Sequence, residues 1–479
     1  MSKYMIGIDI GTQSIRTQLY DERANCICAK SKQQYVDTPK PMWITQKASS
    51  WWDAVKENIR AILAETGVAP DDIVSVGCCA HMHGPVPVKK DRTVVTDDIQ
   101  LYSDKRAAYI AERLRADANF EEVYGITANP PTSNWFGIKI KWLQENMPEV
   151  YEQADKFVTP KDFINFMLTG SACIDPSEAS GSYLMDRKTD EWSDFLVKNL
   201  GVDKEKLPKI CRASQAIGTV CTQAARETGL SEKTVGACGG GDMLCSLFTS
   251  GLNKQGNVVD LAGTGSVICY YTKDPIMDKR IMNLRHVTDG WVPFGNVDSA
   301  GGAFRWLRDT LAKDEVKYAR GRGTDEYAYL CSLAEQTPPG ADGLLFMPYL
   351  MGERTMGSAN SRGCYVGMNL GTTTGHLVRA LLEGVALELK RTLDVFESAG
   401  AKVERVFHIA GGSKGDTWNQ IKADVYGIPV YTLKVDEGGV IAAALLGGLA
   451  AGVYTNEQET AEMVIQVKKE YLPDPKRHA

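Results

Sequence analysis

The chain has 479 residues and a formal net charge of −6, with hydrophobic and charged contents of 43% and 24%. At roughly 100–200 residues per domain, this length predicts two or three domains with large buried cores, and the composition is that of an ordinary globular protein. The negative charge argues against a nucleic-acid or anionic-membrane partner, because such partners favour a basic face.

The start of the chain and its cysteines bear on where the protein works. Met1–Tyr4 leads straight into the apolar stretch Met5–Ile10 without a signal-peptide pattern, and no run of 18 apolar residues occurs. None of the 12 cysteines forms a C-x-x-C pair, so we expect reduced, structural thiols rather than zinc ligands or a disulfide scaffold. These features predict a cytoplasmic protein with no membrane partner.

Two apolar runs that end in glycine open similar halves of the chain. Tyr4–Thr12 (YMIGIDIGT) and Asn257–Ser266 (NVVDLAGTGS) each predict a buried strand that turns sharply at glycine. Ser50–Glu65 predicts a helix with a capping-box-like start, Ser50-x-x-Asp53. Further strands are expected at Ile73–Cys79 and Val406–Ala410, and further helices at Gly375–Glu397, Asp416–Tyr426 and Ile441–Gly452.

The alternation of strands and helices favours the α/β fold class. The repeated strand-and-turn pattern predicts two similar domains, 1–248 and 249–479. A hinge is expected near Cys245–Gly256, where Ser, Thr, Gly and Asn gather before the second opening strand.

The first turn, Asp9–Ser14, has the chemistry of a phosphate site. Gly11 allows close approach of the backbone, and Thr12, Gln13 and Ser14 offer hydroxyl, amide and backbone N–H groups. Asp9 would repel a phosphate but can hold a hydrated Mg²⁺ that bridges to it. The alternative is an ordinary β-turn with an Asx or Ser cap.

Two further glycine turns have related chemistry. Gly263-Thr264-Gly265-Ser266 offers a second phosphate grip, or else a plain hairpin turn. Gly411-Gly412-Ser413, between a predicted strand and a predicted helix, offers a flat backbone shelf for a base or ribose, or else a plain strand-to-helix turn.

Gly239-Gly240-Gly241-Asp242 is the segment whose chemistry points most specifically to a reaction. Three glycines permit unusual dihedral angles and close backbone approach. Phosphoryl transfer to an alcohol needs an acceptor for the hydroxyl proton, and Asp242 fits that role. The alternative is a tight loop in which Asp242 only caps a helix that begins at Met243.

Two polar segments are candidates for recognising a hydroxylated substrate. His81-Met82-His83-Gly84 has no third ligand at metal spacing and is better interpreted as hydroxyl recognition, or as core histidines. Glu353-Arg354-Thr355 offers an ion-pairing arginine, or a structural salt bridge. Among the tryptophans, Trp43 is the one expected to approach a ligand.

Taken in order, these segments resemble the FGGY carbohydrate kinases. That resemblance implies two actin-like, ribonuclease H-like ATPase domains of the actin/hexokinase/Hsp70 superfamily, with an interdomain cleft. The matching segments are IGIDIGTQS at Ile6–Ser14, GGGD at Gly239–Asp242, AGTGS at Ala262–Ser266, GCYVGMNLGTTTGHLVRALLEG at Gly363–Gly384 and IAGGSKGDTWNQIKADVYGIPV at Ile409–Val430.

Within the family, the chain is most similar to the xylulokinase (pentulose kinase) branch. The similar segments are Trp43–Gln46, Met82–Gly84, Pro160–Phe163, Leu168–Gly170 and Pro348–Thr355. Tyr102–Arg106 stands where that branch has W-N-D-G-R, so only Asp104 and Arg106 carry over. Met243 and Asn129–Phe136 also depart from the usual pattern, and these departures leave the sugar open.

The resemblance implies an ATP- and Mg²⁺-dependent kinase of a small ketose, with D-xylulose and its 5-phosphate as first choice. Another pentulose, a deoxyketohexose, erythritol, gluconate or the autoinducer-2 precursor remain alternatives, as do an Hsp70- or actin-like ATPase and a non-catalytic sugar-binding regulator. The sequence does not fix the oligomeric state and leaves a homodimer open. The implied roles are Asp9 for the metal, Gly11, Thr12, Gln13, Ser14, Gly263, Thr264 and Gly265 for phosphates, Gly411, Gly412 and Ser413 for adenosine, Met82, His83, Asp104 and Arg106 for the sugar, and Asp242 as the base.

Overall fold

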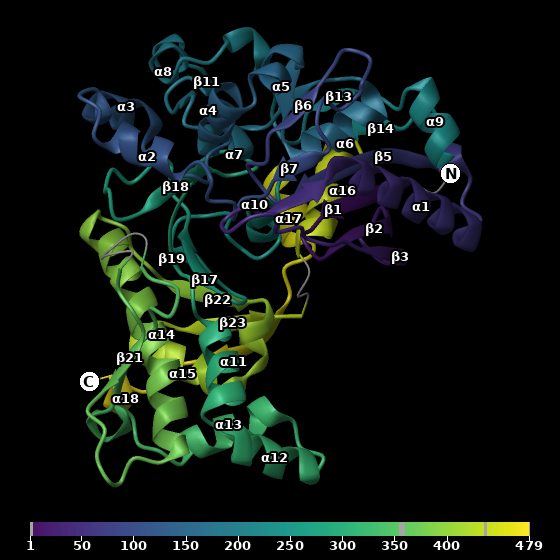
Figure 1. Ribbon diagram of the computed structural model, residues 1–479. Helices are drawn as coiled ribbons and strands as arrows, with labels where there is room; N and C mark the ends of the chain where they lie inside the picture. Colours follow the sequence, from purple (N-terminus) through teal and green to yellow (C-terminus); the bar gives the residue numbers. More distant parts are fainter. Residues whose placement is uncertain (1–2, 354–359, 435–437, 479) are drawn as a thin grey trace. The chain divides into compact units, whose positions relative to one another are not determined.

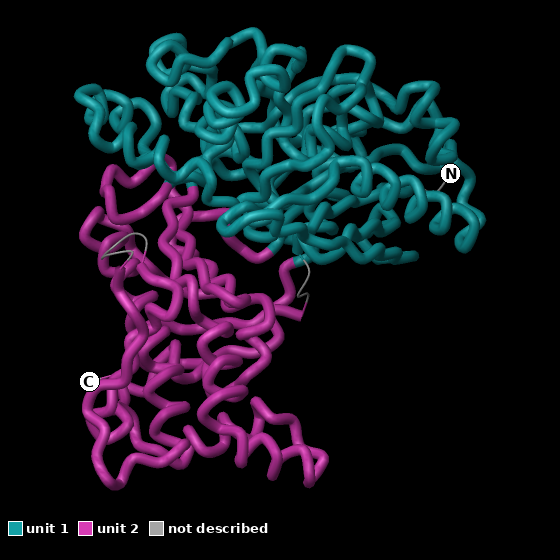
Figure 2. Tube along the Cα trace, in the orientation of Figure 1, with its two compact units in different colours: residues 1–249, 283–291, 437–464 teal, residues 250–282, 292–436, 465–479 magenta. Residues whose placement is uncertain are grey.

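The computed structural model describes residues 3–353, 360–434 and 438–478. The chain forms two compact units, and it passes between them several times (Figure 2). Unit 1 comprises Met1–Thr249, Asn283–Trp291 and Glu437–Val464, and unit 2 comprises Ser250–Met282, Val292–Asp436 and Ile465–Ala479. No helix within the described ranges is long and apolar enough to cross a membrane. Arg354 and Thr355 of the predicted ion-pairing segment lie outside the described residues.

A mixed sheet forms the centre of unit 1, in the order β13-β14-β5-β1-β2-β3, with β15 paired to β5 (Figure 1). β1 runs parallel to β5 and antiparallel to β2, so the first predicted strand turns into a hairpin. The strands are β1 (Tyr4–Ile10), β2 (Ser14–Asp21), β3 (Cys26–Gln33), β5 (Ile73–Ala80), β13 (Ala216–Thr219), β14 (Val235–Ala237) and β15 (Gly240–Gly241).

Helix α16 (Gly438–Ala450) packs closely on this sheet, although it comes from the far end of the chain. Gly7 of β1 and Gly77 of β5 permit the approach. A Cβ on Gly7 would lie 2.0 Å from the carbonyl oxygen of Val440, and one on Gly77 would lie 2.0 Å from that of Ala443. The small residues of α16 and the two glycines therefore fit one another.

Helix α1 (Ala48–Thr66) packs against β2 and β3 and buries Trp51. The predicted capping box at its start is wrong. The helix begins two residues before Ser50, with Lys47 at the N-cap and no side-chain cap, and the Ser50 hydroxyl donates to the Lys47 carbonyl instead. The hydrogen bonds of Ser49 to Asp97 stabilise this earlier start.

A second mixed sheet has the order β18-β19-β17-β16-β22-β23-β24. β16 forms a hairpin with β17 and runs parallel to β22, which repeats the arrangement of β1, β2 and β5. The strands are β16 (Asn257–Ala262), β17 (Ser266–Tyr270), β18 (Met282–Arg285), β19 (Trp291–Val297), β22 (Arg405–Ile409), β23 (Val430–Leu433) and β24 (Val467–Tyr471). The long helix α14 (Thr374–Ser398) and α15 (Asp416–Tyr426) confirm two predicted helices. The predicted α/β class is confirmed.

The remaining elements are shorter. The other helices of unit 1 are α2 (Ala108–Arg115), α3 (Phe120–Thr127), α4 (Phe136–Asn146), α5 (Pro148–Gln153), α6 (Pro160–Thr169), α7 (Pro176–Ala179), α8 (Asp194–Leu200), α9 (Thr222–Thr228), α10 (Asp242–Phe248) and α17 (Glu457–Glu462). Those of unit 2 are α11 (Gly301–Thr310), α12 (Lys313–Gly321), α13 (Glu326–Glu335) and α18 (Pro475–His478). The 3₁₀ helices are η1 (Pro70–Asp72), η2 (Ser180–Ser182), η3 (Lys204–Lys206), η4 (Ala341–Gly343) and η5 (Gly411–Lys414).

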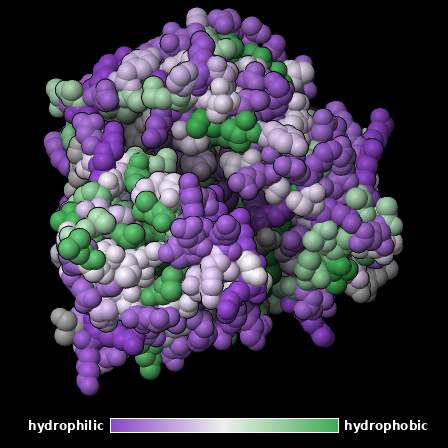
Figure 3. Space-filling model, turned by 60° about the horizontal axis from the view of Figure 1, so that its bottom comes forward, coloured by the Kyte–Doolittle hydropathy of each residue, from purple (hydrophilic) through white to green (hydrophobic). Residues whose placement is uncertain are grey.

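Within the described residues, five two-stranded ribbons complete the fold. They are β4 (Thr45–Lys47) with β7 (Asp98–Gln100), β6 (Val86–Val88) with β8 (Lys156–Val158), β9 (Cys173–Ile174) with β12 (Lys209–Ile210), β10 (Met185–Asp186) with β11 (Glu191–Trp192), and β20 (Leu345–Met347) with β21 (Cys364–Val366). The face shown in Figure 3 is mainly hydrophilic, with hydrophobic residues in separate small groups, as is usual for a protein surface in water.

Candidate active site

The turn between β1 and β2 is tied to the body of unit 1 through its carbonyl groups. The Gly11 amide donates to the Ser14 carbonyl at 3.1 Å, which closes a hairpin turn. The amide of the buried Gln46 donates to the Thr12 carbonyl at 2.7 Å, and the Gln34 amide donates to the Gln13 carbonyl at 2.8 Å. The segment is a short hairpin connection, and it leaves Gln13 exposed.

Asp9, on β1, lies opposite Arg16 of β2 in the hairpin register. The Arg16 guanidinium donates to Asp9 Oδ2 at 2.6 Å, and the Cys79 thiol lies 3.5 Å from Oδ1. Asp9 is 4% exposed. Arg16 is a site residue that our sequence reasoning missed. The register of the predicted hairpin would have identified it, because residues paired across a hairpin share one face of the sheet.

Asp242 is the first residue of α10, and its Oδ1 accepts a hydrogen bond from the Met243 amide at 2.7 Å. Gly241 occupies the N-cap, so the helix begins one residue earlier than the capping alternative required. Burial, together with the nearby Asp9 carboxylate, raises the pKa of Asp242 to about 7, and Arg16 acts against both. A carboxyl that titrates near neutral pH is matched to work as a general base.

Other elements of unit 1 hold the glycine loop that carries Asp242. Gly239 has a φ of 70°, and a Cβ there would lie 1.9 Å from the Cys78 carbonyl oxygen, so only glycine fits. The Gly241 amide donates to the Ser177 hydroxyl at 3.1 Å. The loop is thus fixed on β5 at one end and on α7 at the other.

Helix α6 anchors the start of the same loop. The Cys238 carbonyl accepts from Asn165 at 2.7 Å and from Lys161 at 3.4 Å. Lys161 also forms ion pairs with Asp162 and Asp175, and all three side chains are fully buried. The Pro160–Phe163 segment, which carried only a family resemblance in the sequence, therefore supports the proposed base.

The Met82–Gly84 segment lies beside this loop. A Cβ on Gly241 would lie 2.7 Å from the Met82 sulfur, so Met82 packs directly against the residue before Asp242. His83 has a φ of 71° and donates its backbone N–H to Glu178 Oε2 at 3.1 Å, with its Nδ1 3.5 Å from the same oxygen. Burial lowers the pKa of His83 to about 3, so its ring is neutral.

Asp104 and Arg106 form one buried unit. Asp104 is 0% exposed and accepts the Ile44 amide at 2.6 Å together with the Arg106 amide at 3.0 Å and its guanidinium at 2.6 Å. The guanidinium lies over the ring of Trp43, 3.8 Å from its centroid, and near that of Trp142 at 5.0 Å. Asp104 is therefore fully engaged in orienting Arg106, and Trp43 contacts that side chain.

Lys139 is a second residue that sequence reasoning did not assign. It is fully buried, and its ammonium donates to the Leu101 carbonyl at 2.5 Å. Burial lowers its pKa to about 7, and the nearby Asp104 carboxylate opposes that shift. Its charge also acts on His83. Electrostatics therefore join Lys139, Asp104, Arg106 and His83 in one region of unit 1.

In unit 2, the second glycine turn joins β16 to β17 as a hairpin. The Gly263 amide donates to the Gly265 carbonyl at 2.8 Å. The Thr264 carbonyl accepts from the amides of Ala300 and Gly302, at 3.0 and 2.8 Å, where α11 begins. The helix start thus fixes the turn, and sequence reasoning missed this part of it.

The Gly411–Ser413 turn follows β22 as the 3₁₀ helix η5. A Cβ on Gly412 would lie 2.6 Å from that of Ala262, the residue before Gly263. The two glycine turns of unit 2 are therefore in contact. Ala410 holds a φ of 66°, a value that non-glycine residues rarely adopt, at the point where the turn begins.

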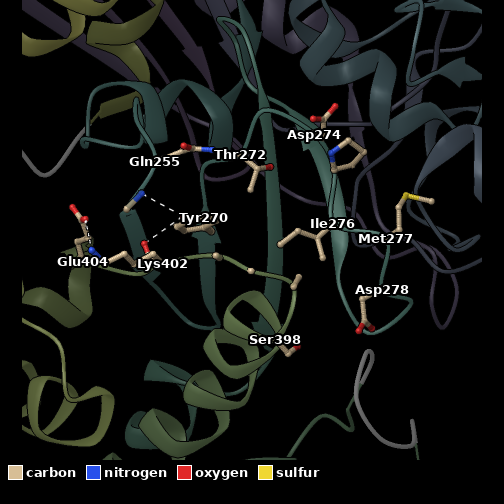
Figure 4. A pocket seen from close by; sticks show the side chains of 15 residues that line it. Gln255, Tyr270, Thr272, Asp274, Ile276, Met277, Asp278, Ser398, Lys402 and Glu404 are labelled. Carbon is tan, nitrogen blue, oxygen red and sulfur yellow. Dashed lines mark hydrogen bonds and ion pairs between the residues drawn. The ribbon is translucent and has the colours of Figure 1, made fainter.

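A cavity of about 710 Å³ lies elsewhere in unit 2 (Figure 4). Its walls include Gln255, Tyr270, Asp278, Ser398 and Lys402, and the Tyr270 hydroxyl bridges the Gly256 amide and the Lys402 carbonyl. Gly256 directly precedes β16 and Tyr270 ends β17, so this wall lies at the opposite end of the hairpin from the Gly263–Gly265 turn. The cavity is thus separate from the predicted phosphate site.

The donor chemistry around Asp9 fits Mg²⁺ rather than a metal held by protein alone. Among the residues described, no group of three or more His, Cys, Asp or Glu side chains could hold a metal ion. Mg²⁺ is usually bound by one or two carboxylates together with phosphate oxygens and water. Asp9 is a single buried carboxylate beside the predicted phosphate turn, which agrees with that pattern.

Matches to known families and proteins cover nearly all of the chain. The model "FGGY family of carbohydrate kinases, N-terminal domain" matches residues 4–249, and that of the C-terminal domain matches 259–451. A xylulose kinase of Bacillus subtilis is 29% identical over 98% of this chain and 93% of its own. A gluconokinase of Bacillus licheniformis is 28% identical over 97% and 91%. The structure of a ligand-bound xylulose kinase from Lactobacillus acidophilus is 26% identical, with a TM-score of 0.91 over 99% and 95%.

Proposed function

Because the chain belongs to the FGGY family of carbohydrate kinases, with its two-domain actin-like ATPase fold, we propose that it phosphorylates D-xylulose to xylulose 5-phosphate. The family makes the chain a phosphotransferase that acts on an alcohol group of a sugar. The contact of Met82 with Gly241 is the observation that carries the sugar assignment, because it sets the Met-His-Gly segment directly beside Asp242. The full-length similarity to xylulose kinases supports it.

On the sugar side, Met82 and His83 contact the substrate, and Arg106 donates hydrogen bonds to its hydroxyls. Asp104 acts through Arg106, since its own oxygens are occupied. Asp242 accepts the proton of the hydroxyl that attacks the γ-phosphate. The hydrogen bonds of Asn165 to the Cys238 carbonyl and of the Gly241 amide to Ser177 fix the loop that carries Asp242. The base is therefore oriented toward the hydroxyl in one geometry.

On the nucleotide side, Gly11, Thr12, Gln13 and Ser14 of unit 1 hold phosphate oxygens, as do Gly263, Thr264 and Gly265 of unit 2. Gly411, Gly412 and Ser413 support the adenosine. Asp9 would hold Mg²⁺, which would supply positive charge against the phosphates during transfer. Arg16 keeps Asp9 in place and adds a positive charge beside Asp242.

Gluconate is the second candidate substrate. A gluconokinase matches this chain about as well as the xylulose kinases do. Lys139 acts electrostatically on His83, and its positive charge would favour a sugar carboxylate in that part of unit 1. The remaining family substrates have no feature of this structure that favours them.

An ADP-release screen tests the proposal. The panel is D-xylulose, D-ribulose, fuculose, rhamnulose, gluconate, erythritol, glycerol and the autoinducer-2 precursor, with ribulose as a matched control that differs from xylulose at one carbon. We expect the highest kcat/KM with D-xylulose. A response to glycerol or gluconate alone would overturn the xylulose assignment. Sugar-independent ATP turnover would favour an Hsp70- or actin-like ATPase. Tight sugar binding without phosphate transfer would favour a sugar-binding regulator.

A further inference from the structure

A series of buried polar side chains starts at the hairpin turn of unit 2. The Ser266 hydroxyl, at the end of the Gly263–Gly265 turn, donates to Asp260 Oδ1 at 2.6 Å. Lys422, on α15, donates from Nζ to Asp260 Oδ2 at 2.5 Å. The Tyr426 hydroxyl also donates to Asp260 Oδ2, at 3.0 Å. Asp260 thus links the hairpin to α15.

The series continues from Lys422 to the second glycine turn. Lys422 Nζ lies 2.9 Å from His408 Nε2, and His408 Nδ1 is hydrogen-bonded to Asn419 Oδ1. The Asn419 amide nitrogen then donates to the Ser413 carbonyl at 2.8 Å, inside the Gly411–Ser413 turn. One unbroken path of hydrogen bonds therefore joins the two turns.

The chemistry of the groups fixes the direction of each bond. An ammonium only donates, so His408 Nε2 accepts from Lys422. The proton of the neutral ring is then on Nδ1 and is donated to Asn419 Oδ1, which leaves the Asn419 N–H group for Ser413. Burial lowers the pKa of His408 to about 4, which agrees with a neutral ring. The His408 tautomer with its proton on Nδ1 is therefore consistent with all of these hydrogen bonds.

The location of these groups indicates positioning rather than stability. Asp260, His408, Asn419 and Lys422 are each 0% exposed. A buried ion pair costs so much desolvation that apolar residues of the same volume often stabilise a fold as well or better. The benefit of this one is the fixed geometry of the two segments that it joins.

We propose that Lys422 is a positioning residue for the nucleotide. It holds the Gly263–Gly265 turn and the Gly411–Ser413 turn in one rigid platform for phosphates and adenosine. The proposal rests on the proposed function of those turns. The close approach of Gly412 to Ala262 supports it independently, because Ala262 directly precedes the Gly263–Gly265 turn. No contact of Lys422 with the nucleotide itself is required.

Calorimetric binding of Mg–ADP in the absence of sugar tests this role. Lys422→Met keeps the length of the side chain but breaks the path, and we expect it to weaken Mg–ADP binding by about tenfold or more, as for lost hydrogen bonds to a charged group. Tyr426→Phe is the matched control, because it removes a hydrogen bond from the same carboxylate without breaking the path. We expect it to bind Mg–ADP as the wild type does.

Steady-state kinetics separate positioning from a general loss of structure. In Lys422→Met, KM for ATP should rise while KM for the sugar stays unchanged, since the sugar-site residues belong to unit 1. If Lys422→Met fails to fold, the double variant Asp260→Asn/Lys422→Met removes both charges together and should show the same weakened binding. Unchanged Mg–ADP affinity in the variant that folds, or an equal loss in Tyr426→Phe, would overturn the proposal.

The same experiments distinguish this proposal from the proposed function. A wild-type protein that binds no Mg–ADP would refute the kinase assignment of the turns and with it the role of Lys422. A wild type that binds Mg–ADP but phosphorylates no sugar of the panel would refute only the substrate assignment. Loss of binding in Lys422→Met would still establish the platform in that case.

Discussion

At the scale of single residues, the site of unit 1 depends on how three charges share one buried region. Asp9 and Asp242 repel one another, and burial disfavours the ionised form of Asp242, so its pKa rises to about 7. Arg16 partly offsets this because it pairs with Asp9 and lowers the pKa of Asp242. The base is thus strong enough to accept a proton and still ionised in useful amount near neutral pH.

Asp242→Asn should therefore lower kcat by about 10²–10⁴-fold, the usual contribution of a general base. Circular dichroism should show an unchanged fold. Above pH 7 the variant should unfold at a higher temperature than the wild type, because it lacks a buried ionised carboxylate. That advantage should shrink as the pH falls from about 7 toward the ordinary value of 3.8, where the folded wild type is protonated. Near wild-type turnover in this variant would remove Asp242 from the mechanism.

The pH dependence of kcat/KM for the sugar gives a separate prediction. Asp242 must be ionised to accept the proton, so kcat/KM should rise with pH through about 7 and then level off. Arg16→Gln removes a charge that lowers this pKa, so the rise should move to higher pH. Lys47→Gln, which breaks an exposed ion pair with Asp98, serves as the control and should leave the profile in place. A flat profile across neutral pH would contradict the assignment.

At the scale of elements, the sheet of unit 1 depends on the β1–β2 hairpin and on helix α16, which is rich in small residues. The β16–β17 hairpin has the corresponding place in the sheet of unit 2. The β1–β2 and β16–β17 turns are short because each closes at glycine. Helix α16 reaches β1 and β5 because Gly7 and Gly77 have no side chains. Small residues on both partners allow a packing distance that any larger side chain would prevent.

Gly77→Ala should consequently destabilise the protein by about 1–3 kcal/mol, the usual cost of overpacking a buried contact. The added methyl would meet the Ala443 carbonyl, which is backbone and cannot rotate away. Gly125→Ala, in helix α3, is the matched control, because nothing lies within 4 Å of its Cβ position. It should leave stability unchanged or raise it by about 0.5–1 kcal/mol. Urea unfolding of both variants checks the difference, and equal stabilities would mean that α16 does not pack on Gly77.

At the scale of the whole molecule, the chain passes repeatedly between two units that carry different parts of the proposed site. Asp242 and the residues proposed to bind the sugar belong to unit 1, whereas the Gly263–Gly265 and Gly411–Ser413 turns belong to unit 2. Transfer requires all of them at once. A kinase of this kind must also exclude water, which would otherwise accept the phosphate.

We therefore expect the two units to close when both substrates are bound. Small-angle X-ray scattering on Asp242→Asn, which should turn over far more slowly than the wild type, should show a smaller radius of gyration with Mg–ATP and xylulose together than with either alone. Lys422→Met should need more ATP to reach the same compact state. An identical radius of gyration in every ligand state would argue against closure.

Much of the fold could be predicted from local patterns. The strands that precede Gly11 and Gly263, the helix Asp416–Tyr426 and the α/β class follow from periodicity and glycine positions, which act over a few residues. The start of α1 was predicted wrongly, because hydrogen bonds from Ser49 to the distant Asp97 replaced the local capping box.

Short motifs were enough to identify the family, the α/β architecture and the proposed base, because the chemistry of such motifs depends on residues close together in the chain. The pairing of Arg16 with Asp9, the support of the Asp242 loop by Asn165 and Ser177, and the path through Lys422 became visible only in the folded chain. These contacts form between segments far apart in the chain. Their partners are selected by packing and register, which no local pattern encodes.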